Sequence, residues 1–294
     1  MALSLLTASL WGVLPIALKI TLQKLDVYTV TWFRFLVSFG LLAIYLAARG
    51  ELPELKKIRS ASGMLLATAI LFLAGNYLLF LLGLAKTSPA NAQVLFQMAP
   101  VLMGLGGLAI FKERYTKRQW FGLSVMVLGF ALFFHEKLRL LIGVQTQYLA
   151  GSGLIVLAAG LWAVYALAQK QLLQKLPSSS IMLIIYGGCA VLFSFFAQPQ
   201  LLLSLSFWQW GMLIFCALNT LIAYSAFAEA LEHWEASQVS AVLALTPICT
   251  LISGAVSASV FPTLVAPELL TFVAVAGAIL VVSGSAAISL EKSH

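Results

Sequence analysis

The sequence contains very few charged residues. Asp, Glu, Lys and Arg make up 9% of its 294 residues, whereas hydrophobic residues make up 62%. Soluble domains carry about 25% charged residues, because their apolar core needs a polar shell. A soluble fold of this length could not hide so much apolar surface. The composition therefore indicates an integral membrane protein whose first partner is the lipid bilayer.

Residue types that bind metals or carry catalysis are also scarce. The three cysteines, Cys189, Cys216 and Cys249, are scattered through apolar segments, and the three histidines lie at segment edges or in the tail. This spacing predicts neither a metal site nor a disulfide framework. The chain also lacks a G-x-x-x-x-G-K-[ST] loop, which argues against ATP-driven transport. We therefore expect no metal, no cofactor and no enzymatic activity.

The apolar stretches predict an all-α integral membrane fold with ten transmembrane helices. A spanning helix needs about 20 mostly apolar residues. The short connections between the stretches leave no room for a soluble domain. The predicted helices cover residues 2–21, 28–48, 62–84, 90–111, 119–135, 149–170, 179–198, 207–229, 237–259 and 268–289.

The positive charges predict a membrane orientation rather than a nucleic-acid partner. The formal net charge is +7, and almost all Lys and Arg residues lie in short loops, where cytoplasmic retention explains them. The face with fewer of them holds Lys19, Lys24, Lys86, Lys137 and Arg139. The richer face holds Arg49, Lys56, Lys57, Arg59, Lys112, Arg114, Lys117, Arg118, Lys170, Lys175 and Lys292. The bias predicts that the N- and C-termini are both cytoplasmic.

The chain also contains an internal duplication. Residues 10–25 read LWGVLPIALKITLQKL, and residues 161–176 read LWAVYALAQKQLLQKL. Such self-similarity predicts repeated structural units. We place the repeats at 1–140 and 141–294, with five helices each. Because five is odd, the second repeat enters the membrane from the opposite side, so the predicted fold is an inverted repeat, which in transporters encloses a binding site near the midplane.

Aromatic residues and prolines fall near the middle of the predicted helices. Trp11 and Trp162 are equivalent positions of the duplication, and Pro15, Pro100 and Pro247 lie at similar depth. A proline removes a backbone donor, and such backbone is tolerated in a membrane where it lines a cavity or packs in protein. One interpretation is a kinked chamber whose tryptophan rings hold an apolar group of a substrate. The alternative is ordinary packing of the helix bundle.

Polar side chains are expected around the same chamber, because amides in hydrocarbon need partners. Two interpretations remain open: these groups bind substrate, or they form hydrogen bonds that only hold the helices together, worth about 0.6 kcal/mol each on average. The candidate substrate ligands are Asn76, Tyr77, Gln93, Gln97, Tyr165, Asn219 and Tyr224.

Arg34 is the one charge well inside a predicted span. An Arg at a helix centre costs about 2.5–3.5 kcal/mol, so such residues usually face a cavity or a partner. We include Arg34 among the candidate substrate-binding residues, with a substrate carboxylate as one possible partner. The alternatives are snorkelling to the outer surface and pairing with a carbonyl at a helix end.

Glycines seven residues apart mark the last helix of each repeat. Gly122 and Gly129 match Gly277 and Gly284, which puts small residues on one face of each helix. Close helix packing is the expected consequence, and a dimer seam is the alternative. We therefore expect a monomer or a weak homodimer.

Taken in order, these residues resemble the drug/metabolite transporter superfamily, EamA type, with two units covering nearly the whole chain. The resemblance implies transport of small molecules, often export of amino acids or other metabolites, across a bacterial inner membrane. The second unit departs from the pattern, because it has no equivalent of Arg34, and Gln119 aligns with Ala274. The marks are the pairs Leu10-Trp11 and Leu161-Trp162, Arg34, Ala99-Pro100, Thr246-Pro247, and the run Glu113, Gln119, Gly122 and Gly129.

The sequence therefore predicts a secondary transporter that exports amino acids or related zwitterions by alternating access. The tryptophans and Tyr165 would contact the apolar part of the substrate, the other polar groups its polar part, and the prolines would supply the bends. Two other classes stay open. A lipid-handling protein or enzyme at the bilayer interface would have to use the Glu229–Glu235 region with His233, and a channel-like protein would lack saturable exchange.

Overall fold

The computed structural model describes residues 2–53, 63–99, 101–103, 116–141, 146–233, 239, 242–260 and 271–289. These segments are helical, and they contain no strand. The first repeat supplies α1 (Ala2–Thr21), α2 (Val27–Arg49), α4 (Gly63–Lys86), α5 (Pro89–Phe96) and α7 (Lys117–Leu141). The second supplies α8 (Thr146–Leu172), α9 (Ser178–Ser194), the 3₁₀ turn η1 (Pro199–Ser204), α10 (Phe207–His233), α12 (Thr246–Val260) and α13 (Phe272–Ser289).

The chain is an all-α membrane protein. Within the described segments, α1, α2, α4, α8 and α10 are long and apolar enough to cross a bilayer, and α9, α12 and α13 are shorter apolar helices. Local signals set the ends of these helices. Asp26 accepts from the backbone N–H groups of Tyr28 and Thr29 at the start of α2, and Gly50, in the left-handed region at φ 68°, ends it.

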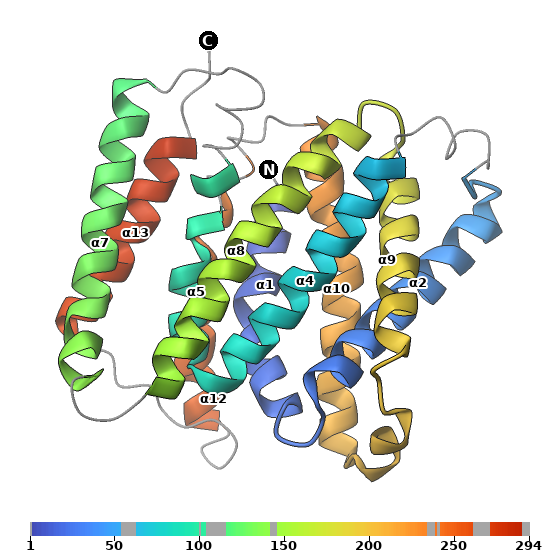
Figure 1. The fold of residues 1–294 in the computed structure, drawn as a ribbon, viewed down its shortest axis with the longest axis horizontal. Coiled ribbons are helices and arrows are strands. Elements are labelled where there is room, and N and C mark those ends of the chain that lie inside the picture. Colours follow the sequence, from blue (N-terminus) through green and yellow to red (C-terminus); the bar gives the residue numbers. More distant parts are fainter. Residues whose placement is uncertain are drawn as a thin grey trace.

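Each main helix contact between the two repeats has an equivalent contact in which the two repeats exchange roles. α1 packs against α10 as α4 packs against α8, and α1 packs against α12 as α5 packs against α8. α2 also packs against its equivalent, α9, and α7 against its equivalent, α13. Figure 1 shows α1 and α8 running in opposite directions, with the α7–α13 pair at one side of the bundle and α2 and α9 at the other. The arrangement is that of an inverted repeat.

Glycines allow α7 and α13 to approach closely. A Cβ atom at Gly277 would lie 2.5 Å from the backbone nitrogen of Phe133, and one at Gly129 would lie 2.6 Å from that of Val281. Gly284 likewise faces the backbone of Gly122, where a Cβ would lie 2.5 Å from the carbonyl oxygen. The glycines therefore pack the last helices of the two repeats against each other within one chain.

Several helices differ from their predicted limits, such as α7, which extends to Leu141 where the prediction ended at 135, and two predicted helices are interrupted by turns. The helix predicted over 90–111 is represented by α5, which stops at Phe96, with a turn at Gln97 before residues 98–99 and 101–103 are helical again. Within the helix predicted over 237–259, the described residues 239 and 242–243 are helical, a turn follows at 244–245, and α12 begins at Thr246. The physical reason is proline chemistry, and it shapes the centre of the molecule.

Candidate functional site

A cavity of about 60 Å³ lies between helices of both repeats. We name it the Arg34 cavity. Its volume has room for a few water molecules, since one water needs about 10–15 Å³ of such space. The lining residues are Trp11, Leu14, Pro15, Leu18, Arg34, Asn76, Tyr77, Phe80, Leu81, Gln93, Phe96, Trp162 and Tyr224.

A second, smaller cavity of about 30 Å³ shares part of this wall. We name it the Gln97 cavity. Four residues line both cavities and so stand between them: Trp11, Gln93, Phe96 and Trp162. The residues specific to the second cavity are Gln97, Ala99, Leu243 and Thr246.

The two cavities extend toward opposite ends of the bundle. The Arg34 cavity follows α1 from Trp11 toward Leu18. At this end of α1, the Lys19 ammonium donates to the carbonyl oxygens of Leu84 and Thr87, just before α5 begins. α5 therefore begins near the Lys19 end of α1 and leads away from it, and the Gln97 cavity lies near the C-terminal end of α5. The four shared residues form a partition across the bundle axis.

The partition is mainly aromatic. The rings of Trp11 and Trp162 meet edge to face, with centroids 6.2 Å apart, and Phe96 lies 6.2 Å from Trp162. Tyr224 packs against Trp11 at 4.9 Å. The indole N–H groups of both tryptophans are buried and have no hydrogen-bond partner among the described residues. An unpartnered buried donor costs about 1–3 kcal/mol, so each of the two indole N–H groups could still gain a hydrogen bond from an acceptor in the cavity.

The proline inside α1 explains one of the predicted polar residues. Pro15 has no N–H to donate to the Trp11 carbonyl one turn earlier. The Gln93 amide nitrogen donates to this carbonyl oxygen instead, at 2.7 Å. The neighbouring carbonyls of α1 are also used, because Asn219 donates to Leu10 at 2.6 Å. A membrane helix with an internal proline needs such replacement donors from its neighbours.

The same chemistry recurs where α5 and α12 meet. Pro247 cannot donate to the carbonyl of Leu243, which instead accepts from the Thr246 hydroxyl at 2.6 Å. The Gln97 amide nitrogen also approaches this turn, at 3.3 Å from the Ala244 carbonyl oxygen. Pro100 lies outside the described residues. Its chemistry would free the carbonyl of Phe96, the residue at which α5 ends.

The predicted polar ligands thus fall into separate groups. The amide nitrogens of Asn76, Gln93, Gln97 and Asn219 all donate to backbone carbonyls of other helices. Asn76 and Gln93 nevertheless line the Arg34 cavity, together with Tyr77 and Tyr224. Gln97 lines the other cavity, and Asn219 lines neither of them.

Tyr165 also lies away from both cavities. It is completely buried, and its hydroxyl donates to the Met182 sulfur at 3.8 Å. Its ring packs against Trp162 and Tyr224, with centroids 6.4 Å away in each case. The residue therefore supports two rings of the cavity wall. Phe80 and Phe96 were missed from the sequence, although their spacing of one turn from Tyr77 and Gln93 could have indicated them.

Arg34 lines the Arg34 cavity and is only 2% exposed. Its Nε donates to the Thr220 hydroxyl at 2.9 Å, and its guanidinium lies 4.6 Å from the centre of the Tyr77 ring. No carboxylate of a described residue pairs with it. The side chain therefore faces the cavity and does not snorkel to the surface in this structure. Its contact with a substrate stays a prediction.

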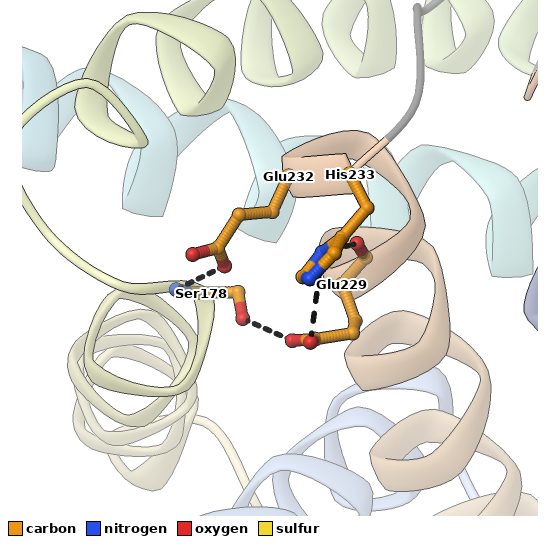
Figure 2. A network of polar contacts seen from close by, with 4 residues as sticks. All are labelled: Ser178, Glu229, Glu232 and His233. Atoms are coloured by element: carbon orange, nitrogen blue, oxygen red, sulfur yellow. Dashed lines mark hydrogen bonds and ion pairs between the residues drawn. The ribbon is translucent and has the colours of Figure 1, made fainter.

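A polar network joins α9 and α10 at one end of the bundle (Figure 2). Glu232 accepts from the backbone N–H of Ser178 at 3.2 Å, and Glu229 accepts from the Ser178 hydroxyl at 2.8 Å. His233 lies 3.7 Å from Glu229, and both side chains are partly exposed. The carboxylates thus stabilise the first turn of α9, whose cap residue Pro177 has no side-chain hydrogen bond. Among the described residues, no three His, Cys, Asp or Glu side chains gather into a metal site.

Comparisons with known proteins cover nearly the whole chain. The sequence model of the EamA-like transporter family matches residues 1–135 and 149–290. An Escherichia coli K12 protein named "Uncharacterized inner membrane transporter YhbE" is 39% identical over 285 residues, covering 96% of this chain and 88% of its own. A Haemophilus influenzae "Uncharacterized transporter" is 36% identical and covers 96% of this chain and 92% of its own.

Two more distant similarities extend this result. A Salmonella typhimurium protein named "Probable amino-acid metabolite efflux pump" is 24% identical and covers 96% of this chain and 92% of its own. A crystal structure of another protein, 16% identical, superposes with a TM-score of 0.69 over 98% of this chain and 96% of that one. At this identity the structural similarity concerns the fold alone.

Proposed function

The chain belongs to the EamA-like transporter family, and from this premise we propose that it exports amino acids or related small zwitterions across a bacterial inner membrane. The substrate class is supported by the distant efflux relative and by a cavity that combines aromatic walls with one cation. The membrane location is supported by the names of the relatives from Escherichia coli.

The single observation that carries the mechanism is the aromatic partition between the two cavities. Each cavity is built from both repeats, and Trp11, Phe96 and Trp162 separate them. In alternating access, two repeats rock about a central site that opens to one side at a time. We propose that residues 1–140 and 141–294 move in this way, and that the partition rings rearrange as substrate passes between the cavities.

The proposed orientation assigns each cavity to one side of the membrane. If both termini are cytoplasmic, the end of α1 lies outside, so the Arg34 cavity leads outward and the Gln97 cavity leads to the cytoplasm. We propose that Trp11, Trp162 and Tyr224 contact the apolar part of the substrate, and that Arg34, Asn76, Tyr77 and Gln93 lie near its polar part. Gln97 meets the substrate on the cytoplasmic side, and Tyr165 and Asn219 position the wall. Pro15, Pro100 and Pro247 provide the bends.

Counterflow in proteoliposomes tests this proposal. Purified protein is reconstituted, loaded with one unlabelled amino acid at a time, and offered the same labelled amino acid outside. We expect transient accumulation with some amino acids and not with others. Liposomes without protein give the background. If folded protein shows no counterflow with any amino acid, the proposed substrate class is wrong.

A further inference from the structure

Arg34 combines burial, charge and a lack of acidic partners in a way that no other described residue does. The side chain is 98% removed from the surface, since only 2% is exposed, yet its protein contacts are one hydroxyl and one aromatic ring. An arginine guanidinium carries five N–H donors in a planar fork. One of them is used by Thr220, which leaves the terminal nitrogens without a hydrogen-bond partner among the described residues.

The described residues that line the Arg34 cavity supply no negative charge. The thirteen residues that line its cavity include no Asp and no Glu, so the wall carries a single positive charge. A buried charge is costly unless it is paired and hydrogen-bonded. The contact with the Tyr77 ring compensates part of this cost. An anion bound in the cavity would compensate the rest of this cost.

The shape of the guanidinium indicates which anion fits. Its terminal nitrogens match two oxygens of a carboxylate in a bidentate pair, which is stronger and more directional than a contact with a spherical ion. The volume of about 60 Å³ accommodates a small head group. The remaining wall is mainly aromatic and aliphatic, and it suits a short apolar remainder rather than a second charged group.

We infer that Arg34 is a carboxylate-recognition site, and that a small organic monocarboxylate binds here whether or not it carries an amino group. This inference rests on the proposed transport function for its biological meaning, and it narrows the substrate class. The carboxylate is bound by α2 of the first repeat. The wall offers no acid for an ammonium group, so the amine of an amino acid is tolerated rather than recognised.

The deciding experiment compares two ligands that differ in charge but hardly in shape. The purified protein in detergent is titrated with sodium propionate or with propionamide, and thermal unfolding is followed at constant ionic strength. Propionate is expected to raise the unfolding temperature in a saturable manner, and propionamide is not. Equal effects of the two ligands would overturn the inference. Sodium chloride and phosphate are further arms, and protection by either equal to that of propionate would overturn the carboxylate class.

Variants assign the effect to the residue. Arg34→Gln is expected to weaken propionate binding at least tenfold, and Arg34→Lys less, because an ammonium keeps the charge but not the planar fork. Arg49→Gln is the matched control, since Arg49 is exposed, and it should bind as the wild type does. Retained binding in Arg34→Gln would overturn the assignment. If that variant does not fold, Arg34→Lys and the comparison of propionate with propionamide in the wild type decide the question.

Counterflow separates this inference from the proposed function. Labelled alanine exchanged against internal alanine is challenged with external propionate or alaninamide. Competition by propionate but not by alaninamide is the expected result. Equal competition by alaninamide would leave the transport function standing and overturn carboxylate recognition. Propionate binding without counterflow would leave the site standing and remove the transport function.

Discussion

Helices α2 and α9 hold equivalent places in the two repeats, and they pack against each other. The offset of 151 residues between Leu10 and Leu161 makes Ile185 the equivalent of Arg34 in the second repeat, since 34 + 151 = 185. Ile185 is completely buried in the apolar core, whereas Arg34 carries a charge into the cavity. The starts of the two helices differ as well. The N-terminal N–H groups of α2 donate to Asp26, the residue just before the helix, whereas an N–H at the start of α9 donates to a carboxylate of α10. The two repeats thus share their helix packing but differ in the side chains at equivalent positions.

The like positions of the two repeats give the largest expected effect. Trp11→Ala combined with Trp162→Ala removes two of the three aromatic rings of the partition, so we expect counterflow to fall by at least about tenfold, or about 1.4 kcal/mol. Each single variant should lose less than the pair. Trp208→Ala is the control, because this side chain is 63% exposed and lines neither cavity. Transport that survives in the double variant would remove the partition from the mechanism.

The glycine contacts of α7 and α13 test the shared framework. Gly277→Ala and Gly129→Ala each place a methyl group against backbone of the other helix. Overpacking of this kind costs about 1–3 kcal/mol, so both variants should unfold at lower temperature in detergent. Gly153→Ala is the matched control, because nothing lies within 4 Å of its added Cβ. It should be neutral or slightly stabilised. Unchanged unfolding of both α7–α13 variants would contradict the packing described here.

The helix starts give the smallest expected effect and sharpen the difference between α2 and α9. Asp26→Ala removes an acceptor of two backbone N–H groups and should cost about 1 kcal/mol of unfolding free energy. Glu232→Ala removes a single backbone contact and should cost less. His233→Ala is the control, since its contact with Glu229 is exposed and such pairs contribute about 0–1 kcal/mol. A larger loss in Glu232→Ala than in Asp26→Ala would reverse this ranking.

Hydropathy predicted the limits of the uninterrupted helices well and those of the interrupted helices poorly. The predicted helix 2–21 coincides with α1, because a continuous apolar stretch has one way to satisfy its backbone in lipid. The helix predicted over 90–111 contains Pro100, from which the sequence predicts a bend but not the residue at which the helix is interrupted. The sequence cannot show where a helix resumes after such a break, since this depends on donors from other helices.

The candidate site was predictable in its residue types and less so in their contacts. Trp11, Arg34 and Trp162 were found from depth and duplication, and all three line the Arg34 cavity. For the glutamines, the sequence left substrate binding and interhelical hydrogen bonding open, and in the structure Gln93 and Gln97 donate to backbone carbonyls of other segments. The apolar wall residues gave no signal of their own, because one Phe or Leu among many in a membrane helix carries no distinguishing pattern.

The single arginine has a consequence for how such a gene can evolve. A homodimer of five-helix units would carry every cavity residue twice, so an arginine at position 34 would bring a second arginine to the place of Ile185. Two buried cations each need their own partner. Joining the two units in one gene removes this constraint, because each copy then mutates alone. A lone buried charge in a twofold arrangement of helices is thus a property that fusion makes accessible, whereas symmetric assembly would have to bury the charge twice.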